Sequence, residues 1–357
     1  MNVEFDVPLS SKTSFGVGGP AALWFDATPA SLPHAVQFAR RVGGPILVLG
    51  SGTNVLVSDD GWPGTVIHVG CAEPSTPPSA RNLPDGGVEV VASACTPLDA
   101  FVAHTVRYQW QGLECLSGIP GSVGAAPVQN VSAYDQRICE VITSVQAFDL
   151  TEQVWRTFTR GECMFGYRTS VFSQPQNTDR YVITQVTMRL IRGGDPCRTH
   201  PDINKSTGPC ATVGMVREAV LRVRHRKGML LGSHDSFASA GSFFKNPVIP
   251  ADEFERSFDA DTIMMGANKW WWPTASGMRV SAAHLIERAG FAKGYARGKA
   301  AISSKHTLCI VNAGGASATD IVGLALEIQD AVASRFTIIL EPEVRPIGFP
   351  SYPLLRS

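Results

Sequence analysis

The sequence has no excess of charge of either sign. Its 31 lysines and arginines balance 31 aspartates and glutamates. Proteins that hold nucleic acid by its phosphates need a basic surface. The composition therefore gives no reason to expect a nucleic-acid partner, and any bound anion must be held by a few locally placed groups.

Long apolar runs are also missing. No segment approaches the roughly 20 apolar residues of a membrane-spanning helix, and the opening MNVEFDVPLSS lacks the basic start and apolar stretch of a signal peptide. We expect no membrane insertion and a cytoplasmic location. With 44% apolar and 17% charged residues the chain is typical of globular proteins, and 357 residues predict two or three domains.

Cysteine pairs of the C-x-x-C type are absent, although the chain has eight dispersed cysteines. This spacing argues against a zinc site and against a compact disulfide scaffold. We expect reduced thiols and no metal.

Hydrophobic periodicity and turn residues predict an alternation of strands and helices. Turn-rich sequence marks a loop or linker at 72–87 and a domain boundary near residue 192. Strands are expected at 44–50, 55–58, 64–70, 88–94, 181–190 and 337–348, and helices at 97–112, 212–228 and 317–336.

Two loops of small residues could hold an anionic cofactor. GSGTN at 50–54 joins two predicted strands, and GIPGSVGAAPVQNVSAY at 118–134 is longer and has few charges. Glycines permit positive φ, and bare backbone amides can surround a pyrophosphate. No GK[ST] follows the first loop, and Val55 breaks the G-x-G-x-x-G pattern. A tight turn and a packed crossover loop are the alternatives, but two such loops together favour a nucleotide-type cofactor.

Three other segments carry candidate chemistry. Arg168 in FGYRTSVF either pairs with a carboxylate of the protein or clamps an anionic substrate. LEPEVRPIG at 340–348 places Glu341, Glu343 and Arg345 on one strand face, which is either solvated or part of a cleft. Ser242 in AGSFFKNP lies outside a G-x-S-x-G elbow. From the residues alone, helix capping is its favoured role, with proton donation to a carbanion as the alternative.

Three consecutive tryptophans occupy positions 270–272. They cannot all face one core, so we expect at least one to stay partly exposed. A loop tip or partner surface is the simpler explanation, and stacking on a ligand ring is the alternative.

Taken in order, the segments resemble those of the UDP-N-acetylenolpyruvoylglucosamine reductase family, flavoenzymes that make UDP-N-acetylmuramate for bacterial cell walls. The resemblance spans roughly residues 8–348. It is carried by GSGTNVLV, GLECLSGIPGSVGAAPVQNVSAY, FGYRTSVF, AGSFFKNP, HLIERAGFAKG and LEPEVRPIG.

The resemblance implies an α+β fold. An FAD-binding domain of the vanillyl-alcohol-oxidase (PCMH) type would occupy 1–192, in lobes of about 1–70 and 71–192, followed by a substrate-binding domain at 193–349. FAD is expected to be non-covalent, because no histidine lies within 50–56 or 118–134. The implied cofactor-binding residues are Gly50, Ser51, Gly52, Thr53, Asn54, Val55, Pro120, Gly121, Ser122, Gly124, Ala125, Gln129 and Ala133.

The resemblance also implies a ping-pong reaction with NADPH as the co-substrate. Hydride passes from NADPH to flavin N5 and then to C3 of the enolpyruvyl sugar nucleotide, UDP-N-acetylglucosamine enolpyruvate. Ser242 then protonates C2, while Arg168 and Glu343 stabilise the intermediate. We expect a monomer. The implied substrate-binding residues are Tyr134, Tyr167, His200, Arg224, Lys227, Asn246, Arg279 and Arg345.

The sequence departs from the family pattern at three places. Ser132 and Asp135 flank Ala133-Tyr134 where the family usually has glycines. His200 stands where one branch of the family has a lid tyrosine, and WWWP replaces a milder segment. Two other readings stay open: a flavin oxidase on the same fold, and an inactive relative that binds nucleotide sugars.

Overall fold

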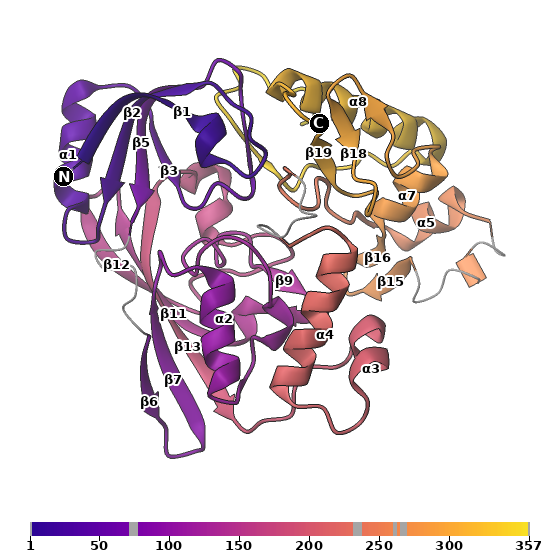
Figure 1. The fold of residues 1–357 in the computed structure, drawn as a ribbon, viewed down its shortest axis with the longest axis horizontal. Coiled ribbons are helices and arrows are strands. Elements are labelled where there is room, and N and C mark those ends of the chain that lie inside the picture. The colour runs from indigo at the N-terminus through magenta and orange to yellow at the C-terminus, as the bar shows by residue number, and fades with distance from the viewer. Residues whose placement is uncertain (1, 71–77, 231–237, 260–262, 265–269, 356–357) are drawn as a thin grey trace. The chain divides into compact units, whose positions relative to one another are not determined.

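The computed structural model describes residues 2–70, 78–230, 238–259, 263–264 and 270–355 (Figure 1). The chain forms two compact units. The first comprises 1–7, 21–52 and 63–236, and the second comprises 8–20, 53–62 and 237–357. None of the described helices is both long and apolar enough to cross a bilayer.

One sheet of the first unit has the order β1-β2-β5-β3. Helix α1 (Leu32–Val42) packs on it, because Leu32, Ala35 and Val36 recur at helical spacing and join a core with Phe25 and Ile67. The expected strands at 44–50 and 64–70 are confirmed as β3 and β5, which pair in parallel. The strands are β1 (Asn2–Pro8), β2 (Pro20–Ala27), β3 (Ile46–Leu49) and β5 (Trp62–Val69).

The second sheet of this unit has the antiparallel order β12-β11-β13-β7-β6, with β8 also on β13. Helix α2 (Leu98–Arg107) buries Leu98, Phe101 and Val102 in the core of this sheet. The helix stops before Gly112, where we expected its end, because Gln109 adopts φ 55° and the chain then joins the sheet as β8. The strands are β6 (Ser79–Asn82), β7 (Gly87–Ser93), β8 (Trp110–Gln111), β11 (Ile142–Asp149), β12 (Val154–Thr159) and β13 (Tyr181–Arg192).

Helices α3 (Pro201–Thr207) and α4 (Val213–Arg226) also belong to the first unit. Helix α4 begins where the Thr212 hydroxyl accepts from the Met215 amide, and its apolar face packs with Ile203 and Cys115. Packing therefore groups residues 193–236 with the first unit. The domain boundary near residue 192, expected from its turn-rich sequence, stays a prediction.

The second unit is built around α8 (Ala318–Phe336), which a capping box of Ser317 and Asp320 opens as its sequence predicts. Three small sheets and helices α5 (Ala251–Ser257) and α7 (Ala282–Arg288) surround a single apolar core. The strands are β4 (Val55–Val57), β14 (Val248–Ile249), β15 (Trp271–Thr274), β16 (Gly277–Val280), β17 (Ala296–Arg297), β18 (Ala300–Ile302), β19 (Ile310–Asn312) and β20 (Arg345–Ile347).

Three local expectations need correction. The strand expected at 337–348 is regular only in β20, because Thr337 takes a left-handed φ of 60° and Pro342 has no amide to donate. The stretch 72–87, expected to be a loop or linker, contains strand β6 in the part that the structure describes. The expectation of reduced thiols is wrong for Cys95, which is disulfide-bonded.

The three consecutive tryptophans lie in the second unit. Trp270 is buried and stacks on His284 at 4.3 Å between ring centroids. Trp271 and Trp272 are partly exposed, and the Trp271 indole donates to the Ile263 carbonyl at 2.9 Å. Partial exposure of at least one tryptophan is confirmed, and the segment serves mainly to pack the unit.

Candidate active site

The two small-residue loops meet within the first unit. A Cβ on Gly50 would lie 3.6 Å from Ser122 Oγ and 3.8 Å from Ala125 Cβ. Gly52 and Gly121 take φ values of 62° and 110°, which side-chain-bearing residues rarely adopt. The sequence predicted each loop separately, and the structure brings them together.

Backbone pairing fixes the second loop against the segment that leads into α2. The Leu98 amide donates to the Gly121 carbonyl at 2.9 Å, and the Gly124 amide donates to the Ala94 carbonyl at 2.8 Å. A Cβ on Gly124 would stand 2.4 Å from Ala94 Cβ, closer than real side chains approach. Only glycine fits at this position.

A charged group braces the start of the same loop. The Asp99 carboxylate accepts a hydrogen bond from the Gly118 amide. It also accepts one from each of the two terminal guanidinium nitrogens of Arg217, at 2.6 and 3.0 Å. Burial by itself raises the pKa of Asp99, but the hydrogen bonds from Arg217 and Gly118 outweigh it and lower that pKa. The loop is therefore held in place by an ionised carboxylate.

These features fit a dinucleotide cofactor such as FAD. The loops converge, lack bulky side chains and have backbone that only glycine adopts at several points. The residues of the first unit that would hold it are Gly50, Ser51, Gly52, Pro120, Gly121, Ser122, Gly124, Ala125, Gln129 and Ala133. Thr53, Asn54 and Val55 belong to the second unit.

Arg168 lies at the tip of a tight turn, with φ 53°, between the bridged residues Gly166 and Thr169. Its guanidinium donates to Ser132 Oγ at 3.0 Å, and Asn130 Nδ2 donates to the Gly166 carbonyl at 2.9 Å. The predicted catalytic arginine is thus bound to the predicted flavin loop. Ser132, one of the departures from the family pattern, is the residue it contacts.

The hairpin of β9 (Ser132–Ala133) and β10 (Gln136–Arg137) accounts for Asp135, the other residue of this departure. Its two turn residues, Tyr134 and Asp135, take φ values of 49° and 65°. This is the conformation of a type I′ turn, in which aspartate is tolerated along with glycine. Asp135 thus preserves the turn that a glycine would make.

We expect Asp135→Ala to be less stable than Asp135→Gly by about 1–2 kcal/mol, because alanine pays the left-handed penalty that glycine avoids. Both variants lose the bond that Asp135 accepts from Thr199 Oγ1, so the comparison isolates the backbone. Urea unfolding measures it. Equal stabilities would contradict the turn assignment.

Three predicted substrate-binding residues gather around this hairpin. The His200 ring meets the Tyr134 ring edge-on at 5.1 Å, and Lys227 Nζ lies 5.8 Å from the centre of the same ring. His200 Nδ1 accepts from the Asp202 amide and opens α3. Burial raises the pKa of Tyr134 to about 12 and lowers the pKa of His200. At neutral pH the site therefore offers a phenol and a neutral imidazole beside Lys227.

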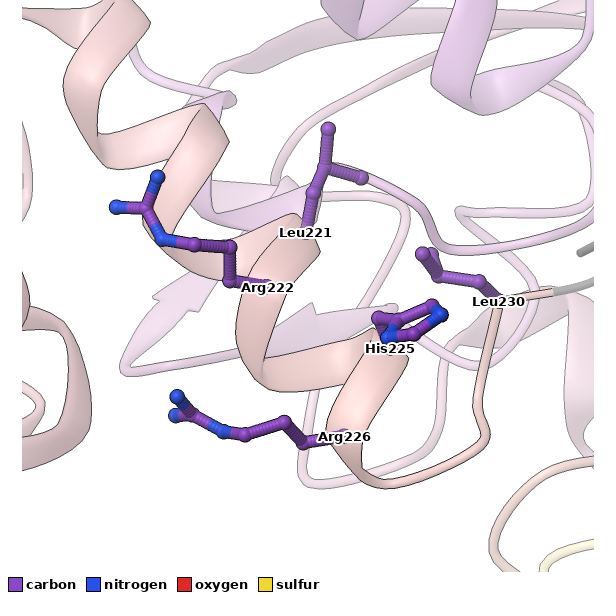
Figure 2. A pocket seen from close by; sticks show the side chains of 5 residues that line it. All are labelled: Leu221, Arg222, His225, Arg226 and Leu230. Atoms are coloured by element: carbon purple, nitrogen blue, oxygen red, sulfur yellow. The ribbon is translucent and has the colours of Figure 1, made fainter. Parts of the chain in front are cut away.

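Arg224 has a structural role at the end of α4. Its Nε donates to the Gly118 carbonyl at 3.0 Å and its Nη2 to the Met229 carbonyl at 2.8 Å. A nearby open pocket of about 470 Å³ is lined by other residues (Figure 2). They are Leu221, Arg222, His225, Arg226 and Leu230.

In the second unit the segments of Ser242 and Glu343 run side by side. Phe244 bridges Pro342 in antiparallel fashion, and the Glu343 amide donates to the Phe243 carbonyl at 2.8 Å. Helix capping by Ser242 is wrong, because the next described helix, α5, begins at Ala251 after Pro250. The structure thus brings together two of the three predicted catalytic residues, and Arg168 lies in the first unit.

Asn54 ties the predicted cofactor loop to these segments. Its Nδ2 donates to the Glu343 carbonyl at 3.2 Å, and its own carbonyl accepts from the Arg345 amide at 3.0 Å. Strands β4 and β20 then continue in parallel from this point. Glu341 is exposed and pairs with Lys245 at 3.1 Å.

The other predicted substrate-binding residues lie apart from these contacts. Asn246 Oδ1 accepts from the Ala282 amide at the start of α7, and Arg279 faces Val248 across β14 and β16. Tyr167 is 43% exposed. Within the described residues no group of histidine, cysteine, aspartate or glutamate side chains is arranged to hold a metal ion.

Sequence reasoning missed two structural supports of the site. Asn130 joins the flavin loop to the Arg168 turn, and Asp99 braces Gly118. Both partners lie far away in the chain, so no local pattern marks them. Asp99 could have been suspected only as an acidic residue in the first turn of a predicted helix.

Comparisons with known proteins agree with these features. The C-terminal domain of UDP-N-acetylenolpyruvoylglucosamine reductase matches residues 233–347, and an FAD binding domain matches 20–157. The reductase of Thermobifida fusca is 41% identical over 96% of this chain and 97% of its own, and that of Nocardia farcinica is 42% identical over 96% and 89%. The crystal structure of the Thermus caldophilus reductase covers 97% of this chain and 99% of its own, with a TM-score of 0.64 and 26% identity. The chain therefore belongs to the UDP-N-acetylenolpyruvoylglucosamine reductase family, with the expected α+β fold and FAD-binding domain.

Proposed function

We propose that this protein reduces UDP-N-acetylglucosamine enolpyruvate to UDP-N-acetylmuramate, a step of peptidoglycan precursor synthesis, with NADPH as the electron source. The observation that carries the proposal is the pairing of the Ser242 segment with the Glu343 segment. It lies in the part of the chain that matches the reductase C-terminal domain. Bound FAD would accept hydride from NADPH and supply it to C3 of the substrate.

The chain's own residues then complete the addition. The Ser242 hydroxyl donates a proton to C2 of the substrate. The charge that develops there spreads onto the adjacent substrate carboxylate, so Arg168 and a hydrogen bond from the Glu343 carboxyl group stabilise it more than they stabilise the ground state. The hydrogen bond to Ser132 orients the Arg168 guanidinium, and the bond from the Glu343 amide to the Phe243 carbonyl fixes the backbone that carries Glu343.

Binding of the nucleotide part of the substrate is assigned to residues other than Ser242, Arg168 and Glu343. Lys227 is half-buried, is 3.7 Å from Asp202, and is positioned beside Tyr134 to meet a diphosphate. His200 takes the position of the lid residue. The remaining contacts are assigned to Tyr167, Arg224, Asn246, Arg279 and Arg345. A monomer in the cytoplasm suits a soluble nucleotide substrate and NADPH, and both are part of the proposal.

The visible spectrum of the purified protein tests the function. We expect the absorbance of oxidised flavin, anaerobic bleaching by NADPH, and recolouring when the enolpyruvyl substrate is added. Recolouring by oxygen alone, with none by the substrate, would instead favour an oxidase. A colourless protein that does not bind FAD would favour the inactive relative.

A further inference from the structure

Two cysteines that are 82 residues apart in the sequence meet in the first unit. Cys115 lies in the short helix η2 (Glu114–Leu116) and is fully buried, whereas Cys197 lies between β13 and α3 and is partly exposed. The Cys115 thiol donates to the Cys197 carbonyl at 3.5 Å. The Cys115 sulfur is therefore in contact with Cys197, and both residues are free thiols.

The backbone holds both cysteines in place. Buried Glu114 accepts from the Cys197 amide at 2.7 Å and from the Gly112 amide at 2.8 Å. The Cys115 amide donates to Gln136 Oε1 at 2.8 Å. Because Glu114, the neighbour of Cys115, holds the Cys197 amide, the two residues are kept in proximity.

The surroundings make the two thiols chemically unequal. The hydrogen bond from Cys115 lowers the pKa of Cys197 to about 6, against the effects of burial and of the Glu114 carboxylate, while Thr199 adds a second hydrogen bond. The same contact, together with burial, raises the pKa of Cys115. Asp135 is the other carboxylate near the pair. Cys197 is thus the more accessible and more acidic thiol, and Cys115 is a buried thiol beside it.

We propose that Cys197 and Cys115 form a peroxide-sensitive dithiol switch beside the Tyr134 hairpin. The Cys197 thiolate attacks the O–O bond of a peroxide, becomes a sulfenic acid and releases hydroxide or alkoxide. The Cys115 sulfur then attacks the Cys197 sulfur, water leaves with the Cys115 proton, and a disulfide forms. A small thiol reverses the step by exchange.

The expected effect on activity rests on the proposed function. Cys197 Sγ lies 3.9 Å from the Tyr134 carbonyl, and two residues later Thr199 Oγ1 bonds Asp135 at 3.2 Å. A bond between the sulfurs must bring them to about 2 Å, closer than any non-bonded contact. It therefore shifts the hairpin and the start of α3, which carries His200. We expect the KM for the enolpyruvyl substrate to rise several-fold, with NADPH-dependent flavin reduction unchanged.

Mass spectrometry of the full-length protein, folded and treated with hydrogen peroxide, tests the switch without any activity assay. We expect a linked peptide joining residues 115 and 197 that dithiothreitol releases. Cys115→Ala should stop at a dimedone-trapped sulfenic acid on Cys197, and Cys163→Ala, which removes another buried free thiol, should leave the linkage intact. Absence of the linked peptide, or equal dimedone labelling of Cys197 and exposed Cys210, would overturn the proposal.

Labelling with iodoacetamide at pH 6 gives a second measurement. At that pH about half of Cys197 is thiolate, against about 0.3% of an ordinary thiol of pKa ≈ 8.5. After allowing for the lower nucleophilicity of the more acidic thiol, Cys197 should react about tenfold faster than such a thiol. A rate no greater than that of exposed Cys210 would contradict the assignment of the thiolate.

Kinetics separate this inference from the proposed function. If the oxidised protein has a raised KM that dithiothreitol restores, and Cys115→Ala shows no such reversible change, the switch is supported. If the disulfide forms and the KM does not move, its regulatory role is wrong. A protein that forms the disulfide but never reduces the enolpyruvyl substrate would contradict the proposed function and leave the redox pair intact.

Discussion

Replacing Ser242 with alanine is expected to slow turnover of the enolpyruvyl substrate by about 10²–10⁴-fold, the usual contribution of a positioned general acid. That loss corresponds to about 3–5 kcal/mol of transition-state stabilisation. Flavin reduction by NADPH should be unchanged, because it requires no proton from residue 242. Anaerobic stopped-flow absorbance of the two half-reactions, each measured alone, distinguishes the effects.

The matched control is Ser239→Ala, three residues earlier. Ser239 is buried, and its hydroxyl accepts from the Gly241 amide at 3.3 Å. The Ser239→Ala variant removes a hydroxyl from the same segment as Ser242→Ala does, so it controls for the structural effect of losing a hydroxyl there. We expect both half-reactions to stay within a few-fold of the wild type. Normal substrate turnover by Ser242→Ala would remove this serine from the mechanism.

Helices and strands with a clear local pattern of apolar residues could be predicted from the sequence. Helix α8 was expected at 317–336 from its amphipathic pattern, and the structure confirms it as Ala318–Phe336. The strand at 181–190 was expected from its alternation and is confirmed as β13. The end of α2 was misjudged, since pairing of β8 with β13 decides it and depends on residues 80 positions away.

The candidate site was predictable in its parts but not in its assembly. Small residues identified both flavin loops, but only the fold shows that Gly50 meets Ser122. Asp135 looked like a departure from the glycine pattern, and the turn it makes depends on the pairing of β9 with β10. The contact of Cys115 with Cys197 has no signature in spacing, because it results from how α3 and α4 pack beside η2.

Replacing Gly124 with alanine is expected to lower the FAD content of the purified protein more than tenfold. The new Cβ would stand 2.4 Å from Ala94 Cβ and about 3 Å from the Ala94 backbone, so the loop must move. Overpacking of this kind costs about 1–3 kcal/mol even where side chains can adjust. Here part of the obstacle is backbone, and the displaced loop carries the amides assigned to the cofactor. The ratio of flavin to protein absorbance measures the loss.

A compensating change makes this prediction sharper. Ala94→Gly combined with Gly124→Ala removes the nearest contact but leaves those with the Ala94 backbone, so FAD content should recover only in part. Gly161→Ala is the control, because a Cβ at that exposed glycine meets no atom within 4 Å. It should keep its flavin and be equally or slightly more stable. Full flavin content in the single Gly124→Ala variant would show that this loop does not hold the cofactor as proposed. Equal loss in the single and double variants would show that the clash with the Ala94 side chain is not the cause.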